Sequence, residues 1–277
     1  MIELRLEGLV HVYRDSTVRA VDGVDLQVGP GQRVAIVGQN GSGKTTLVRH
    51  LNGLLRPTEG RVLVDGSDAA RLHVAQLARR VGLVFQDPDR QIFARSVRAE
   101  VEFGARNVGM DRADRNDAVS QALAATGLEG ESDTNPYDLG DSRRKLLALA
   151  SVLAMRTPVL VLDEPTTGQD VRGVEIVGSV IRAAHAEGRT VIAISHDMGF
   201  VAETFDRVVI MREGRIVLDG SPAGVFAQRA WSTLEETYLE PPFPSRVGAR
   251  LGLDSTPTDE ALIARLRERA SDSVPST

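Results

Sequence analysis

The stretch RVAIVGQNGSGKTT, residues 33–46, joins a short apolar run to a glycine-rich loop and then to a helical pattern. RVAIV, residues 33–37, is apolar on both faces, as a central strand of a parallel sheet is. The loop fits the pattern G-x-x-x-x-G-K-[ST] in full, from Gly38 to Thr45. A glycine-rich turn that matches this pattern by chance would lack the strand before it and the helix after it. The stretch therefore predicts a phosphate-binding loop at the edge of a parallel sheet.

The chemistry of the loop residues suits a nucleotide. Glycines let backbone N–H groups turn inward around phosphates, and the helix N-terminus adds a partial positive charge. Lys44 can reach the outer phosphates, and the Thr45 hydroxyl can bind Mg²⁺. We expect the nucleotide to be bound by Gly38, Asn40, Gly41, Ser42, Gly43, Lys44, Thr45 and Thr46.

An acidic pair ends the apolar run VLVLDE, residues 159–164. Asp163 emerges at the carboxyl end of the predicted strand, where α/β sheets place ligands, and is expected to hold Mg²⁺ largely through water. Glu164 is expected to act as the general base that polarises the attacking water. Such a pair on its own is more often a surface cap, but beside the loop at 38–45 it favours a catalytic interpretation.

Three further side chains are candidates for the same site. His196 ends the predicted strand TVIAISH, residues 190–196, at the same sheet edge as Asp163 and within reach of a γ-phosphate. Gln86 ends VGLVFQ, residues 81–86, and its assignment to the site depends on the other candidate residues at the same sheet edge. Tyr13 can stack on a base, although a partly exposed aromatic of a sheet explains it equally well.

Apolar patterning organises the rest of the chain around this loop. Alternation within residues 2–28 predicts a small antiparallel sheet with one buried face. Residues 90–155 have a helical pattern, and 206–220 predict a hairpin that turns at Glu213 and Gly214. Strands alternating with helices predict a doubly wound sheet interrupted by a helical insertion. Further strands are expected at 60–66, 81–86, 159–164 and 190–196.

The C-terminal part differs in composition. Residues 241–246 are proline-rich, and 258–269 predict a short amphipathic helix capped by Thr258. Its apolar residues on one side are Leu262, Ile263 and Leu266. Residues 270–277 are expected to be disordered.

Composition limits the functional classes. The chain of 277 residues has no cysteine, which excludes disulfides and cysteine-ligated metals and fits a reducing cytosol. No apolar run approaches the roughly 20 residues of a membrane-spanning helix, and the longest, residues 146–155, predicts a buried core helix. The first residues lack the pattern of a secretory signal. A net charge of -5 argues against a nucleic-acid partner.

In this order, the motifs resemble those of the ATP-binding subunits of ABC transporters. The resemblance implies an α/β P-loop NTPase with a RecA-like parallel-sheet core, an N-terminal antiparallel β subdomain and a helical subdomain insertion. It implies an ATPase domain at 1–225, its helical subdomain at about 87–157, and a small C-terminal extension at 226–277. The matching elements are Tyr13 for adenine stacking, Walker A at 38–45, Gln86 in a Q-loop that serves Mg²⁺ and catalysis, Walker B at 159–164, the D-loop at 166–170 with Asp170, and His196 as switch histidine.

A finer resemblance points to energy-coupling factor (ECF) importers, the group that includes cobalt and vitamin uptake ATPases. It is carried by QDPDRQIF at 86–93, DEPTTGQD at 163–170 and the tail EPPFPSRVGARLGL at 240–253. The likeness implies a peripheral ATPase at the cytoplasmic face of the cell membrane, whose Q-loop region touches a membrane scaffold protein. A separate membrane subunit would capture the substrate: a vitamin, a vitamin precursor or a transition-metal ion.

One element departs from that family. NPYDLGDSRRK, residues 135–145, stands where the family has LSGGQ, a signature that contacts the nucleotide of a second ATPase subunit. Leu139 is retained, and the residues that replace the rest are Gly140, Asp141, Ser142 and Arg143.

The changed signature leaves two interpretations open. Asp141 should repel phosphate or cap its own helix, whereas Ser142 still offers a hydroxyl and Arg143 and Arg144 offset the charge. A plain helix start with an Asp or Ser cap fits equally well. Because Glu164 is intact, we expect a heterodimer with an ATPase whose signature is closer to LSGGQ, while a homodimer stays open.

The sequence is also compatible with three alternative functions, each with a feature that speaks against it. An ATPase of another importer class lacks the pattern at 86–93. A non-transport ABC ATPase of DNA repair or translation usually has long coiled coils or two cassettes, and this sequence has neither. A binding-only regulatory subunit would not need Glu164 and His196.

Overall fold

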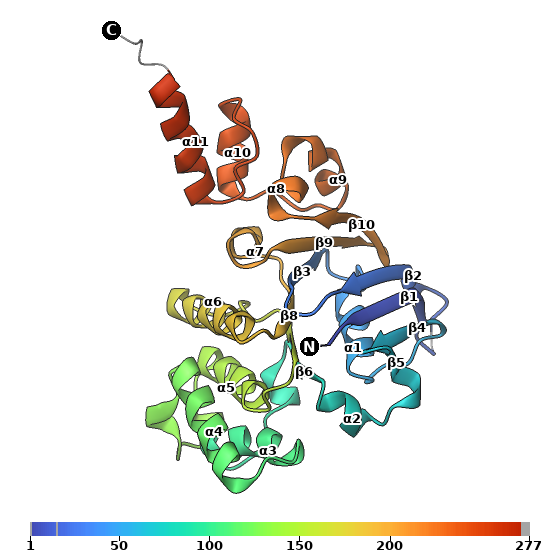
Figure 1. The fold of residues 1–277 in the computed structure, drawn as a ribbon, viewed down its shortest axis with the longest axis vertical. Coiled ribbons are helices and arrows are strands. Elements are labelled where there is room, and N and C mark those ends of the chain that lie inside the picture. Colours follow the sequence, from blue (N-terminus) through green and yellow to red (C-terminus); the bar gives the residue numbers. More distant parts are fainter. Residues whose placement is uncertain (1, 15, 273–277) are drawn as a thin grey trace.

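The computed structural model describes residues 2–14 and 16–272, and its strands form two sheets (Figure 1). The smaller sheet has the order β2-β1-β4-β5 and is antiparallel throughout. This confirms the antiparallel sheet predicted for the N-terminal part, which also takes in the strand expected at 60–66. Its strands are β1 Leu4–Val12, β2 Arg19–Val28, β4 Glu59–Val64 and β5 Ser67–Asp68.

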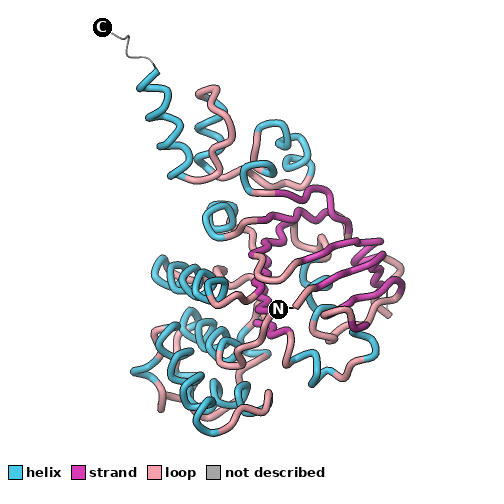
Figure 2. Tube along the Cα trace, viewed as in Figure 1, coloured by secondary structure: helices cyan, strands magenta, loops and turns pink. Residues whose placement is uncertain are grey.

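The larger sheet has the order β10-β9-β3-β8-β7-β6. Figure 2 shows the strands of both sheets in magenta. Its strands pair in parallel except for β10, which forms the predicted hairpin with β9 around Glu213 and Gly214. The strands are β3 Arg33–Gly38, β6 Val81–Val84, β7 Val159–Asp163, β8 Thr190–Ile194, β9 Arg207–Arg212 and β10 Arg215–Gly220.

The two faces of this sheet contribute to two separate cores. On β3, Val34 and Ile36 pack with the antiparallel sheet, whereas Ala35 and Val37 pack with helices on the other face. All four are fully buried, as expected for a central parallel strand. The phosphate-binding loop is thus attached to a strand whose four central residues are fully buried.

Three helices form a lobe inserted between β6 and β7, in the lower part of Figure 1. They are α3 Val97–Asn107, α4 Arg112–Thr126 and α5 Asp141–Leu153. Asp111 caps α4, and Gly127 ends it in a left-handed conformation. Residues 146–152 of the apolar run are buried along α5 as predicted, whereas Leu153 and Met155 are only partly buried. The other helices before the tail are α1 Lys44–Leu51, α2 Val74–Ala78, α6 Val171–Ala186 and α7 Met198–Thr204.

Between β10 and residue 272, the described part of the chain forms four α-helices at the upper end of the molecule in Figure 1: α8 Pro222–Val225, α9 Trp231–Glu236, α10 Phe243–Arg250 and α11 Asp259–Asp272. Thr258 Oγ1 accepts from the Ala261 N–H, as expected of the cap. Of Leu262, Ile263 and Leu266, only Leu262 is buried, and α11 packs against α10. Disorder was the wrong expectation for residues 270–272, which continue α11, and 273–277 lie outside the described residues.

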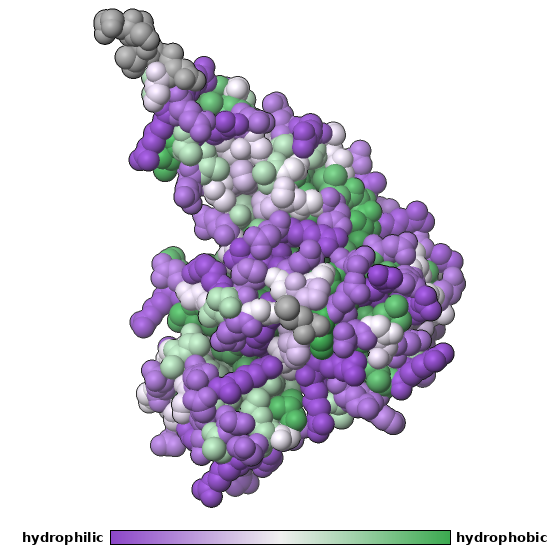
Figure 3. All heavy atoms as spheres, viewed as in Figure 1, coloured by the Kyte–Doolittle hydropathy of each residue, from purple (hydrophilic) through white to green (hydrophobic). Residues whose placement is uncertain are grey.

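Hydrophilic residues cover most of the face shown in Figure 3, with hydrophobic residues in smaller areas among them. Within the described ranges, no helix combines the length and apolar character needed to cross a membrane.

Candidate active site

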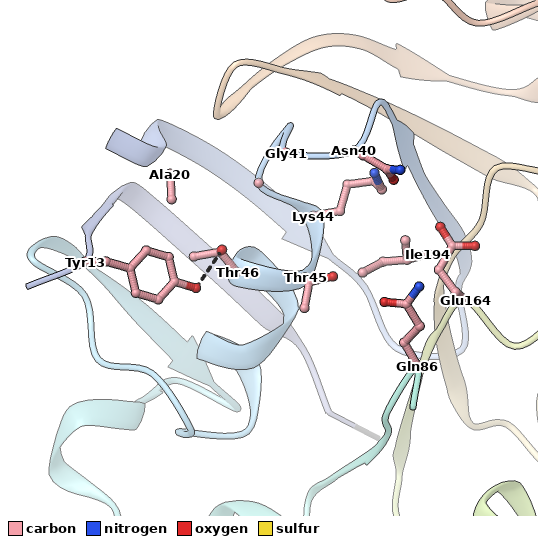
Figure 4. A pocket seen from close by; sticks show the side chains of 11 residues that line it. Tyr13, Ala20, Asn40, Gly41, Lys44, Thr45, Thr46, Gln86, Glu164 and Ile194 are labelled. Atoms are coloured by element: carbon pink, nitrogen blue, oxygen red, sulfur yellow. Dashed lines mark hydrogen bonds between the residues drawn. The ribbon is translucent and has the colours of Figure 1, made fainter. Parts of the chain in front are cut away.

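A cavity of about 360 Å³ opens beside the glycine-rich loop, where the antiparallel sheet meets the parallel sheet (Figure 4). The loop between β3 and α1 forms one wall, and the ends of β6, β7 and β8 form another. The lining residues are Tyr13, Ala20, Asn40, Gly41, Gly43, Lys44, Thr45, Thr46, Gln86, Glu164 and Ile194.

Two glycines of the loop have no room for a side chain. Gly43 is the N-cap of α1 and has a φ of 101°, and a Cβ there would lie 2.2 Å from the Ala20 carbonyl oxygen. A Cβ at Gly38 would lie 2.3 Å from the Met211 carbonyl oxygen. The loop is therefore held tightly between β2 and β9, which explains the glycine spacing in structural terms.

Lys44 lies inside the loop. Only 6% of the residue is exposed, and its Nζ donates to the carbonyl oxygens of Gly38 at 2.7 Å and Gln39 at 2.8 Å. Burial lowers the pKa of the Lys44 ammonium, while the carboxylates of Glu164 and Asp163 act in the opposite direction. A shielded cation at the wall of the cavity suits the binding of phosphate oxygens.

Hard oxygen donors meet where α1 and β7 approach each other. Thr45 Oγ1 donates to Asp163 Oδ1 at 3.2 Å, and Asp163 is 3% exposed. Burial raises the pKa of the Asp163 carboxyl. Gln86 follows β6, which ends at Val84, two residues earlier than the predicted strand, and its side chain lies near Thr45 and Glu164 in Figure 4. This hydroxyl, carboxylate and amide set fits Mg²⁺, which prefers oxygen ligands together with substrate phosphates and water.

Glu164 follows β7 in an unusual backbone conformation, with a φ of 53°. Its N–H donates to the Ile194 carbonyl at 3.0 Å, which fixes the turn to β8. Its carboxylate Oε2 accepts from His196 Nδ1 at 2.7 Å and from Thr167 Oγ1 at 3.2 Å. The structure therefore brings Glu164 and His196 together, although 62% of the His196 side chain is exposed and His196 lies outside the cavity lining.

Tyr13 lies at the outer end of the cavity and is 41% exposed. Its hydroxyl shares a hydrogen bond with Thr46 Oγ1 at 3.0 Å, and the edge of the His11 ring packs against its ring. The ring is thus fixed to α1 while remaining accessible, as a stacking platform for a base must be.

Sequence reasoning missed several contributors. Thr167 lies directly after Walker B, so its proximity in sequence to Glu164 was a usable signal. Ala20 and Ile194 have no chemical signal, because only strand packing brings them to the cavity. Ser42, expected at the nucleotide, is 4% exposed, and its carbonyl accepts from the Gly214 N–H at 3.0 Å, which ties the loop to the β9–β10 hairpin.

The signature stretch lies outside the residues that line this cavity. Leu139 is buried, and Gly140 is the N-cap of α5 with no side-chain cap bond. The expected Asp or Ser cap is therefore wrong: Asp141 is already the first helical residue, its side chain 86% exposed and paired with Arg144.

The other replaced residues of the signature are engaged within the chain. Arg143 Nε donates to Glu131 Oε2 at 2.7 Å, so Arg143 does not neutralise Asp141 as expected. Ser142 Oγ donates to Gln169 Oε1. Asp170, the predicted D-loop acid, caps α6 by accepting from the Gly173 N–H at 2.7 Å.

A phosphate-binding loop, a buried Walker-type aspartate and a following glutamate at one sheet edge define a P-loop nucleotide hydrolase. The ABC transporter family model matches residues 21–167. An energy-coupling factor transporter ATP-binding protein EcfA2 from Clostridium perfringens is 39% identical over 87% of each chain. The chain therefore belongs to the ABC transporter family, in its energy-coupling factor group, and it is an ATP-binding and ATP-hydrolysing subunit.

Solved structures agree with this assignment. The structure of cbiO1 from Clostridium perfringens, part of the ABC transporter complex cbiONQ, has a TM-score of 0.74 and 36% identity, over 90% of this chain and 98% of that one. A dimeric ATP-binding cassette in a post-hydrolysis state with ADP and Pi has a TM-score of 0.73 at 24% identity, over 79% of this chain and 98% of that one, which supports the fold. The P-loop ABC ATPase fold expected from the sequence is confirmed.

Proposed function

We propose that the chain hydrolyses ATP with Mg²⁺ at this cavity to energise import by an ECF-type transporter at the cytoplasmic face of the cell membrane. The transported substrate is a vitamin, a vitamin precursor or a transition-metal ion. The observation that carries the site assignment is the Glu164 carboxylate, held by His196 and Thr167 at the wall of a cavity that also contains Lys44.

In the proposed reaction, a water oxygen bonds to the γ-phosphorus while the bond to the bridging oxygen of ADP breaks. Glu164 takes the proton that the water loses. Lys44 and the loop N–H groups stabilise the phosphate charge, and His196 keeps the Glu164 carboxylate oriented through its Nδ1–H. Gln86 helps to position the water. The residues proposed to hold the nucleotide are Tyr13, Gly38, Asn40, Gly41, Ser42, Gly43, Lys44, Thr45 and Thr46.

The ligands proposed for Mg²⁺ are Thr45, Gln86 and Asp163. When bound, the cation would neutralise charge on the β- and γ-phosphate oxygens. The hydrogen bond of 3.2 Å between Thr45 Oγ1 and Asp163 Oδ1 supports this ligand set, because it keeps the two side chains close together.

A second ABC ATPase subunit is proposed to complete the site. Leu139, Gly140, Asp141, Ser142 and Arg143 would face the nucleotide of that subunit, together with Asp170 of the D-loop. The first turn of α5 supports this, because its N-cap is Gly140, which has no side chain to occupy the N–H groups there. The acidic Asp141 favours a heterodimer in which the partner has the better signature.

The Q-loop region is proposed to dock on a membrane scaffold protein. An apolar groove of about 570 Å³ lies between α2, α3 and α5, next to this region. Phe93, 58% exposed, packs edge-on against Phe103 there, and Val74 is 50% exposed. A separate membrane subunit would capture the substrate, and no nucleic-acid partner is proposed.

Co-purification tests the proposal as a whole. The chain is isolated from membranes of its own cell with its bound proteins, and these are identified by mass spectrometry. We expect a second ABC ATPase, a multi-span scaffold and a small membrane protein, with vanadate-sensitive ATP hydrolysis by the complex. Recovery of soluble partners alone would contradict the proposal.

A further inference from the structure

Two buried histidines lie behind the exposed ring of Tyr13. His11 is in β1, two residues before Tyr13, so strand alternation places both side chains on one side. His50 is in α1, four residues after Thr46, so these two residues lie on one face of the helix. We call His11 and His50 the histidine pair.

Contacts join the histidine pair, Tyr13 and Thr46 into a closed ring. The Tyr13 hydroxyl shares a hydrogen bond with Thr46 Oγ1 at 3.0 Å, drawn in Figure 4. The Thr46 carbonyl accepts from His50 Nδ1 at 2.7 Å, and His50 Nε2 accepts from His11 Nδ1 at 3.2 Å. The rings of His11 and Tyr13 meet edge to face, with 4.7 Å between their centroids. The hydroxyl and the ring of Tyr13 are therefore held from two different elements.

Two backbone carbonyls set the direction of the hydrogen bonds in the histidine pair. The Arg56 carbonyl lies 3.2 Å from His11 Nδ1, and the Thr46 carbonyl lies 2.7 Å from His50 Nδ1. A carbonyl can only accept, so each Nδ1 has a proton, and His50 Nε2 is left as the acceptor for His11. Burial lowers the pKa of His50 to about 4, which keeps that acceptor unprotonated near pH 7.

The backbone around Tyr13 is fixed as well. The Val12 N–H donates to Thr58 Oγ1 at 3.0 Å, and the Ser16 N–H donates to the Tyr13 carbonyl at 3.0 Å. The remaining freedom of Tyr13 is rotation of its side chain, and the contacts with Thr46 and His11 restrict that rotation.

We propose that His11 and His50 are positioning residues that hold Tyr13 in the orientation in which it stacks on the base of ATP. The inference rests on the proposed function, in which Tyr13 binds the nucleotide. The histidine pair is absent from the cavity lining, so it acts through Tyr13 and Thr46, which do line the cavity. A ring that is already ordered loses less conformational freedom when a base stacks on it, which strengthens binding. The histidine pair therefore affects the affinity for ATP and not the chemistry at Glu164.

The test compares ATP with tripolyphosphate, which has phosphates but no base, in titrations of the full chain with Mg²⁺. We expect His50→Leu, which removes both hydrogen bonds of the side chain, to weaken ATP binding about three- to tenfold. Its Kd for tripolyphosphate should change by less than about twofold, because phosphates contact the loop at 38–45. In the assembled transporter, KM for ATP should rise while kcat falls by less than about twofold. His50→Gln, whose amide oxygen can still accept from His11, should recover part of the affinity.

Tyr13→Ala completes a double-mutant cycle. Alone it should weaken ATP binding about fivefold or more, because base stacking is lost. Adding His50→Leu should then weaken binding by less than about twofold further, since the ring that His50 positions is gone. His185→Leu is the matched control, because it makes the same substitution at a partly buried histidine of α6. It should bind both ligands as the wild-type chain does.

Equal weakening of ATP and tripolyphosphate binding by His50→Leu would overturn the proposal, because it would show that His50 supports α1 and the loop instead of Tyr13. An unchanged ATP Kd in His50→Leu would also overturn it, as would the same loss of affinity with and without Tyr13. Should His50→Leu fail to fold, the same comparison with His11→Leu decides between these outcomes.

The proposed function fails separately. In that case the wild-type chain would bind neither ligand, or Tyr13→Ala would bind ATP as tightly as the wild-type chain. A chain whose ATP affinity depends on Tyr13, but is unchanged in His50→Leu, would refute the role of the histidine pair alone.

Discussion

Glu164 shows how the fold sets the position of one carboxylate. A φ of 53° is costly for a residue with a side chain, and such strain persists only where the surroundings hold it. Here the backbone of Glu164 is held by the hydrogen bond from its N–H to β8, and its carboxylate is held by hydrogen bonds from His196 and Thr167. The strained turn directs the carboxylate to the wall of the cavity instead of continuing β7.

Replacing Glu164 with Gln removes the proposed base while keeping the shape of the side chain. We expect ATP hydrolysis by the complex to slow by about 100-fold or more, because a general base commonly contributes at least that much. ATP binding should persist, since Lys44 and the loop are unchanged. Single-turnover phosphate release and an equilibrium ATP titration measure the two effects. Glu175→Gln, on the exposed face of α6, is the control.

His50 offers a test of burial behind the nucleotide site. It is 1% exposed on α1, and its Nδ1 donates to the Thr46 carbonyl at 2.7 Å, while its Nε2 accepts from His11 Nδ1 at 3.2 Å. Burial lowers the pKa of His50 from 6.5 to about 4. As the pH falls, His50 therefore becomes protonated at a higher pH in the unfolded chain than in the folded chain. The stability of the folded chain is unaffected by His50 above pH 6.5, and it decreases as the pH falls towards 4.

For the wild-type chain we expect His50 to lower the free energy of unfolding by about 2 kcal/mol when the pH falls from neutral to about 5. Urea denaturation at the two pH values measures this, and His50→Gln should lose that part of the pH dependence. His185→Gln, at a partly buried site near the end of α6, should retain it. An unchanged pH slope in His50→Gln would show that His50 does not cause the effect.

At the scale of elements, the sequence predicted what short-range chemistry determines. The loop at 38–45 and the strand before it were predictable, because phosphate binding requires a fixed spacing of glycines, Lys44 and Thr45. The contact between Ser142 and Gln169 was not, since it depends on how α5 and α6 pack across a gap of 27 residues. The exposure of Ile263 and Leu266 could not be predicted either, because helical periodicity defines an apolar face but not the element that covers it.

The groove between α2, α3 and α5 carries a prediction about docking. Phe93→Asp would place a charge among apolar side chains, so we expect the membrane scaffold to be lost from the purified complex. ATP binding by the variant should remain, since Phe93 is outside the cavity of the nucleotide. Co-purification and an ATP titration check both parts. Leu54→Asp, at a residue 46% exposed after α1, should leave the complex intact.

At the scale of the whole molecule, the proposed dimer would give this chain two half-sites of unequal quality. Its own cavity is lined by Lys44 and Glu164, each held by its own hydrogen bonds, whereas the stretch at the signature position has the exposed, acidic Asp141 at the start of α5. A helix N-terminus favours anions, but a carboxylate at the first position competes with a phosphate for that favourable end. In a homodimer both nucleotides would face an Asp141 residue. In a heterodimer only one of the two nucleotides would do so.

This asymmetry gives the last prediction, which concerns assembly. The purified chain alone should bind ATP but hydrolyse it slowly and without cooperativity, because each site of a homodimer would face Asp141. Adding the partner ATPase should raise the rate and produce a heterodimer, as measured by phosphate release and by mass photometry. Asp141→Gly should raise the rate of the chain alone, because it removes the like charge from the path of the phosphate, whereas Asp138→Gly, an exposed acid just upstream, should not. Robust, cooperative hydrolysis by the unmodified homodimer would refute the asymmetric pair.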